Sequence, residues 1–198
     1  MNILSLAASL CILAGSAAAV DSPQPLPEPR VAIAFEPGVN SLASLAGMTL
    51  SYHPSSRFAV DAGAGFGLTN LRYGLRGRVF LNPFWRDFHP FVGLFYCHAQ
   101  GWGDDTLSMN MTVTRNGESR EYDFGMVIDP SDYLGAQIGF EMRFGHVLIR
   151  PGFGWAVSLG GRNWRAVEGD APTGKDRFGM DFLYGSGPSA STALGFYF

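Results

Sequence analysis

The chain has 198 residues and a formal net charge of −3 at pH 7, and only 16% of its residues are charged. An acidic balance argues against a nucleic-acid partner, which requires a basic face. Sparse charge together with 26 glycines favours a tightly packed barrel facing lipid over a soluble helical protein.

Residues 1–19 have the pattern of a secretory signal peptide. An apolar stretch, Ile3 to Leu13, leads into small residues, Gly15 to Ala19, and cleavage is expected before Val20. The segment departs from the usual pattern because no Lys or Arg precedes the apolar stretch. The alternative, a membrane anchor, requires about 20 apolar residues, and this run is shorter. Removing the signal would remove Cys11 and leave Cys97 alone, so no intrachain disulfide is expected.

Residues 20–30 form a proline-rich lead, for which an extended chain is expected. Residues 31–198 are then expected to form one domain. Charged or polar residues recur every few positions in this region, so no part of it resembles a membrane-spanning helix. If the domain crosses a membrane it must do so as a closed barrel, because lipid leaves no water to satisfy backbone polar groups.

Eight segments alternate between apolar residues and small or polar residues, which is the period of a β-strand with two different faces. They are residues 31–36, 47–52, 58–68, 71–81, 91–101, 133–144, 147–157 and 191–198. In the last, Thr192, Leu194, Phe196 and Phe198 share one face, opposite Ser191, Ala193, Gly195 and Tyr197. Segment 91–101 is apolar on both faces, so its inward side is unassigned.

In such a barrel the short connections would all lie at one end and the long connections at the other. The turns at 54–57, 82–89 and 145–146 are fairly short and lie on the side where the first strand begins. The long loops, 102–132 and 160–188, both fall at the opposite, extracellular end. Because eight is even, the two chain ends share a side, as in bacterial barrels. The sequence therefore predicts an all-β fold, an eight-stranded antiparallel up-and-down transmembrane β-barrel.

Aromatic residues gather where the two membrane interfaces would lie. Phe84, Trp85, Phe88 and Phe91 fall near one rim, and Trp102 and Trp155 near the other. Such positions indicate an interfacial girdle. The alternative is that these are ordinary buried aromatics of a soluble barrel.

The alternation, the loop asymmetry and the terminal Phe198 make nearly all of residues 31–198 resemble the small outer-membrane barrels of the OmpA-transmembrane and OmpX type. The resemblance implies a monomer exported to the bacterial outer membrane, with lipid and lipopolysaccharide as neighbours. It also implies insertion by the barrel-assembly machinery, with Phe196 and Phe198 in the insertion signal. It carries over no catalytic, cofactor-binding or metal-binding residue.

The predicted inward face is strongly charged. It carries Glu36, Asp61, Arg72, Arg76, Arg78, Glu141, Arg143 and Arg150. A small barrel is filled by its own side chains, and Arg pairs well with carboxylates in a confined space. We predict a structural charge network that plugs the lumen. The alternative is a narrow path or site for anions, created by the surplus of positive charge.

Neither long loop contains a motif for a particular partner. Loop 102–132 is acidic, and its Asn116–Gly117 turn predicts a hairpin. Its acidic residues fit a solvated face better than a divalent-cation site, because no calcium-loop spacing is present. Loop 160–188 mixes both signs of charge, and Trp164 and Phe178 are expected to offer contact surface.

Among the histidines only His98 falls toward the outer half of the barrel, and it is followed by Ala99 and Gln100 rather than a serine nucleophile. Cys97 and His98 alone make no metal site. We therefore expect a non-enzymatic barrel without a cofactor, structural or adhesive or ligand-binding through its extracellular loops. The alternatives are a soluble periplasmic or secreted ligand-binding barrel and a lipid A-modifying enzyme centred on His98.

Overall fold

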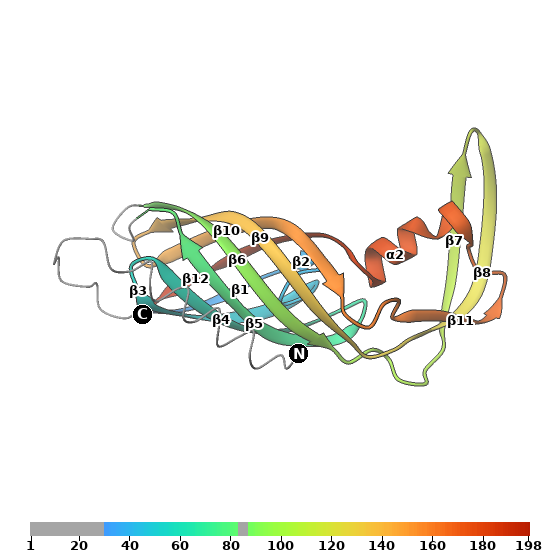
Figure 1. Ribbon diagram of the computed structural model, residues 1–198, viewed down its shortest axis with the longest axis horizontal. Helices are drawn as coiled ribbons and strands as arrows, with labels where there is room; N and C mark the ends of the chain where they lie inside the picture. The colour runs from blue at the N-terminus through green and yellow to red at the C-terminus, as the bar shows by residue number, and fades with distance from the viewer. Residues whose placement is uncertain (1–29, 83–86) are drawn as a thin grey trace.

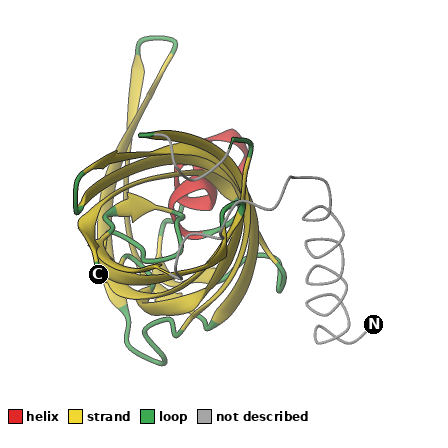
Figure 2. Ribbon diagram, turned by 90° about the vertical axis from the view of Figure 1, so that its left-hand side faces the viewer, coloured by secondary structure: helices red, strands yellow, loops and turns green. Residues whose placement is uncertain are grey.

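The structure is a computed structural model, and it describes residues 30–82 and 87–198. The predicted signal peptide and most of the proline-rich lead lie outside these residues, as do Phe84 and Trp85. Eight strands form a barrel, which Figure 2 shows as a ring seen from one end. They are β1 (Arg30–Phe35), β3 (Ala46–Ser55), β4 (Phe58–Gly67), β5 (Asn70–Phe80), β6 (Phe88–Ala99), β9 (Ser131–Phe144), β10 (Val147–Ser158) and β12 (Gly187–Tyr197).

Each barrel strand pairs antiparallel with the next barrel strand along the chain, and β12 pairs with β1 to close the sheet. A two-residue strand, β2 (Gly38–Val39), also pairs with β12, beyond the end of β1. The predicted fold is confirmed: the barrel is all-β, antiparallel and up-and-down. We call the end that holds the turns at residues 56–57 and 145–146 the turn end.

The two faces of the barrel have the polarity predicted from the alternation. Large apolar side chains point outward along every strand; Ile138, for example, is 64% exposed and Phe153 62%. Small and charged residues point inward, as the buried Thr49 and Ser51 do on β3. On β6, whose sides the sequence left open, Phe91, Phe95 and Cys97 are buried in the interior and Val92 and Leu94 face out.

Two of the aromatic residues predicted for the girdle lie elsewhere. Phe91 is buried in the lumen, where its ring meets that of Phe80 edge-on at 6.2 Å. Trp102 donates its indole N–H to the Leu68 carbonyl at 2.9 Å and packs against a second core. Phe88 and Trp155 are exposed on the outside, as predicted. Phe91 misled the prediction because its strand is apolar on both faces.

A second structural unit, which we call the cap, stands at the end of the barrel opposite the turn end (Figure 1). Its three-stranded sheet has the order β11 (Trp164–Gly169), β8 (Glu118–Ile128), β7 (Leu107–Arg115). A 3₁₀ helix (Gly174–Arg177) and α2 (Phe178–Tyr184) complete it. Within the described ranges no helix has the length and hydropathy of a membrane-spanning segment.

The cap has a hydrophobic core of its own. Its buried members are Tyr122, Phe124, Met126, Ile128, Trp164, Met180 and Tyr184. The hairpin predicted around Asn116–Gly117 is confirmed as β7 and β8. Loop 160–188 is more ordered than predicted, and its Trp164 is 3% exposed, so the expectation that Trp164 offers contact surface is wrong. Phe178 is 72% exposed.

Candidate functional site

The predicted lumen residues lie inside the barrel, and Asp61 is at the centre of their contacts. Arg78 binds both oxygens of Asp61, through Nε at 2.8 Å and Nη2 at 2.9 Å. Arg76 reaches the same carboxylate through Nε at 2.6 Å. Alternate residues of β5 therefore bring two guanidinium groups onto one carboxylate of the neighbouring β4, because residues two apart on a strand share a face.

The other two carboxylates extend this cluster to the remaining walls. Glu36, which follows β1, accepts hydrogen bonds from both terminal nitrogens of Arg76, at 2.7 and 2.8 Å, and from Arg150 at 2.8 Å. Glu141 on β9 accepts from Arg78 at 2.9 Å and from Arg143 at 3.0 Å. Three carboxylates and four arginines thus connect β1, β4, β5, β9 and β10 across the lumen.

Neutral groups that the sequence reading did not single out complete the network. Gln137 accepts from Arg76 at 3.0 Å, and Ser51 and Thr49 each accept from Arg150 at 3.0 Å. The Tyr197 hydroxyl donates to Glu141 and accepts from Arg143 at 2.8 Å. Such partners matter because a buried ion pair is stable only if its remaining donors and acceptors are also satisfied. Their inward position on alternating strands was the available signal.

The lumen is further filled at the cap end by residues 38–45, which fold back inside the barrel. Leu42 and Ala43 are buried there, Leu42 in a cluster with Phe95 and Tyr133. Gly47 and Gly65 make room for this segment, since a Cβ on Gly65 would lie 2.1 Å from the Ala43 carbonyl oxygen. The strand glycines of the sequence therefore have a packing role. Side chains in the middle and residues 38–45 at the cap end thus occupy most of the interior, as expected for a small barrel.

Arg72 is the predicted lumen residue that the structure keeps apart from the network. Among the described residues no carboxylate lies within ion-pair distance of it. Its Nη1 donates to the Ser41 carbonyl at 3.2 Å, and its guanidinium lies 4.3 Å from the centre of the Tyr133 ring. It is nevertheless 2% exposed.

His98 lies on the outward face of β6, near the cap end. Its Nδ1 is 2.8 Å from Asp132 Oδ1, and the Tyr96 hydroxyl donates to the same oxygen at 2.8 Å. Sequence reasoning missed Asp132 as a partner because the residue is 34 positions away. No serine is a hydrogen-bond partner of His98 in the described part of the chain, and no cluster of metal-binding residues occurs there. The group therefore holds an acid and a base but lacks the nucleophile of acyl-transfer chemistry.

The outer parts of the cap are held together by polar contacts. The Tyr122 hydroxyl donates to Asp176 Oδ2 at 2.6 Å, and this hydrogen bond raises the pKa of Tyr122. Trp164 donates to Asp181 at 3.1 Å, and Arg177 lies 3.0 Å from the same carboxylate. Asn40 and Tyr133 of the barrel donate to the backbone carbonyls of Phe182 and Tyr184, so α2 is attached directly to the barrel mouth.

A closed antiparallel barrel with an apolar exterior and an ionic interior has the architecture of an outer-membrane β-barrel. In solved structures, the chain is similar to the N-terminal β-barrel domain of Pseudomonas aeruginosa OprF, at 13% identity and TM-score 0.44 over 85% of this chain and 97% of that one. It is also similar to Acinetobacter baumannii CarO, at 9% identity and TM-score 0.43 over 84% and 97%. No protein-family model and no curated protein matches the chain.

Proposed function

We propose that this protein is a non-enzymatic barrel of the bacterial outer membrane that carries the cap on the cell surface. The observation that carries the proposal is that the barrel has an apolar exterior, whereas the cap has an apolar interior. The barrel exposes large apolar side chains around its circumference, whereas the cap buries them in a core of its own. A lipid-facing anchor with a water-facing unit at one end explains both.

The interior supports an anchoring role over transport. Buried ion pairs occupy the middle of the lumen and residues 38–45 fill the cap end, so the barrel walls enclose protein rather than a channel. Binding or adhesion then belongs to the cap, since exposed segments on a rigid scaffold are where recognition residues occur. The cap presents the exposed Phe178 ring and the exposed first residues of β8, Glu118 to Glu121.

Fractionation with site-specific labelling tests the location. Cys97 is buried, so a cysteine introduced at Asn116, the tip of the β7–β8 hairpin, would be the main reactive thiol. We expect outer-membrane recovery, a gel shift on boiling, and labelling of intact cells by an impermeant maleimide. The matched variant Gly145→Cys, at the turn end, should label only after lysis. Recovery in the soluble fraction without a gel shift would instead support the alternative of a soluble ligand-binding barrel.

Removal of the hairpin tests the role of the cap. A chain lacking residues 107–128 should still reach the outer membrane with its heat-dependent shift but lose cell-to-cell aggregation. Unaltered aggregation would contradict binding through the cap. The lipid A mass spectrum should be the same with and without the chain, and a changed acylation pattern that depends on His98 would establish the enzymatic alternative.

Insertion is tested at the last strand. The barrel-assembly machinery is the proposed partner, with Phe196 and Phe198 as its recognition residues; both are exposed on the outward face. Phe198→Ser should lower outer-membrane recovery more than Phe153→Ser, a matched change of an exposed phenylalanine on β10.

A further inference from the structure

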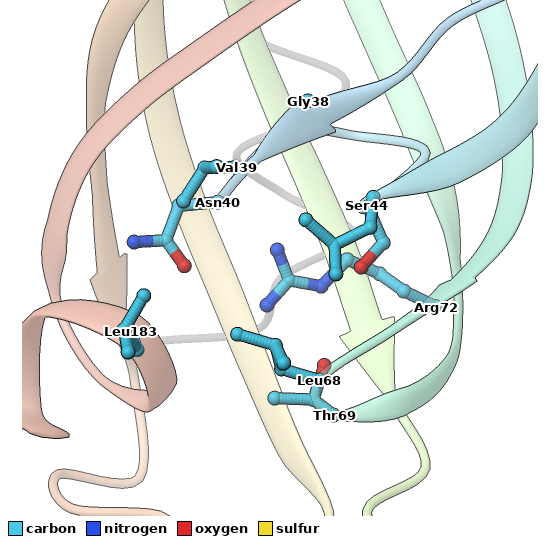
Figure 3. A pocket seen from close by; sticks show the side chains of 9 residues that line it. Gly38, Val39, Asn40, Ser44, Leu68, Thr69, Arg72 and Leu183 are labelled. Carbon is cyan, nitrogen blue, oxygen red and sulfur yellow. The ribbon is translucent and has the colours of Figure 1, made fainter. Parts of the chain in front are cut away.

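A small cavity lies in the barrel mouth, between the wall, the inward-folded segment 38–45 and the cap (Figure 3). It is lined by Gly38, Val39, Asn40, Ser44, Leu45, Leu68, Thr69, Arg72 and Leu183. The cavity volume is about 10 Å³ and the cavity is open on one side, so it has room for one small group. Leu183 belongs to α2, so the cap contributes to the walls.

Two donors of this cavity have no hydrogen-bond partner. Arg72 Nε and Thr69 Oγ1 are both buried and both unpaired in the described structure. Figure 3 shows the Arg72 guanidinium in the middle of the lining, with Thr69 beside Leu68. A buried polar group without a partner costs about 1–3 kcal/mol, and more if it is charged. Two such groups on one cavity indicate that something accepts from them.

The charge around the cavity selects the kind of acceptor. Of the five buried arginines in the described part of the lumen, four share three carboxylates, whereas Arg72 donates to the Ser41 carbonyl and lies against the Tyr133 ring. Five arginines against three carboxylates leave the described lumen with two positive charges in excess. A buried guanidinium without a counter-charge is unfavourable, and an anion would compensate it where a water molecule would not.

We propose that Arg72 and Thr69 bind one small inorganic anion of about the size of chloride in this cavity. The guanidinium supplies the charge and the Nε–H, and the Thr69 hydroxyl supplies a second donor. Because Leu183 of α2 lines the cavity, the bound anion also strengthens the docking of α2 on the barrel.

The test uses the full chain folded in detergent and compares sodium chloride with sodium gluconate at equal ionic strength. We expect chloride to slow amide exchange in residues 178–184 and the protein to broaden the ³⁵Cl resonance. In crystals grown with bromide, an anomalous peak should lie beside Arg72. A wild-type protein with no chloride response and no bromide peak would overturn the proposal and leave water in the cavity.

Variants separate binding from a loss of structure. Arg72→Met should abolish the chloride response, whereas Arg165→Met, which removes the same charge from an exposed site in the cap, should preserve it. If Arg72→Met fails to fold, Thr69→Val tests the site instead. This variant keeps the Arg72 charge and a side chain of nearly the same shape, and it removes only the hydroxyl donor. It should weaken chloride binding by roughly two- to tenfold, the equivalent of one hydrogen bond. Undiminished binding in Thr69→Val or in a folded Arg72→Met would contradict the site.

Discussion

The barrel and the cap are built from the same strand pattern with opposite orientation. In the barrel the alternating apolar residues face outward and the charged residues pair inside, as Asp61 does with Arg76 and Arg78. In the cap the apolar residues of β8 face a core and the charged residues face out. The hydrophobic effect drives apolar surface away from water, so the surrounding medium decides which face is buried. The comparison predicts that the two units respond to different substitutions.

The largest effect is expected from loss of charge in the barrel. Asp61→Asn leaves Arg76, Arg78 and Arg150 with two carboxylates in a buried site, and breaking a buried pair in this way costs about 3 to 5 kcal/mol. The midpoint of the heat-dependent gel shift should fall sharply. The exposed Asp105→Asn serves as control. Equal midpoints for the two variants would show that the ionic network does not stabilise the barrel.

A cavity in the cap core should destabilise the cap and spare the barrel. Phe124→Ala removes a buried ring, at a cost of about 3 kcal/mol. Limited proteolysis of residues 102–130 should become faster while the heat-dependent gel shift is unchanged. Phe178→Ala, the same change at an exposed ring, should alter neither. A barrel midpoint that falls with Phe124→Ala would mean that the two units unfold together.

A third substitution tests the packing of the inward-folded segment. Gly65→Ala places a Cβ 2.1 Å from the Ala43 carbonyl oxygen, and overpacking of this kind costs about 1 to 3 kcal/mol. We expect residues 38–45 to move and their amide hydrogens to exchange faster with solvent. Gly77→Ala is the matched control, because its Cβ meets only the Phe58 ring at 3.7 Å. If amide exchange in residues 38–45 is the same in both variants, the close packing of Gly65 against the segment does not hold it in place.

The smallest expected effect concerns a single hydrogen bond in the cap. Tyr122 must be neutral to donate to Asp176, and this bond raises its pKa. The contact should persist at neutral pH and be lost as the pH rises through that raised value. Tyr122→Phe should remove one late-titrating phenol from the absorbance titration and speed amide exchange in residues 174–177 at pH 7. Tyr52→Phe, on the barrel exterior, should leave that exchange unchanged.

The alternating strands of the barrel could be predicted from the sequence because each carries its own signal. Every strand with one charged face has the predicted orientation, including β5, where Arg72, Arg76 and Arg78 point inward. Strand β6 lacked such a signal, and its inward Phe91 was assigned to the wrong place. The cap around Trp164 was missed because β11 is stabilised by pairing with β8, about 40 residues earlier, and not by its own pattern.

The pairing of particular side chains in the interior could not be predicted from the sequence. A period of two tells which side chains point inward but not which of them meet across the lumen. Arg150 lies 114 positions from Glu36, and only the closed ring brings them to 2.8 Å. Arg72 faces inward on β5 as Arg76 does, yet it lies four residues nearer the mouth, beside Ser41 and Tyr133.

Closure of the barrel through β1 and β12 has a consequence for tolerance to insertions. In an open sheet, a strand that slips by one residue can shift freely at the edge. In a ring the shear is fixed, so a slip in one pairing must be undone by an opposite slip in another. Each slip also exchanges the lipid-facing and lumen-facing sides of a strand. The wall therefore has a single register for all eight strands, whereas the cap, an open sheet, can accept added residues at its hairpin tip and diversify there.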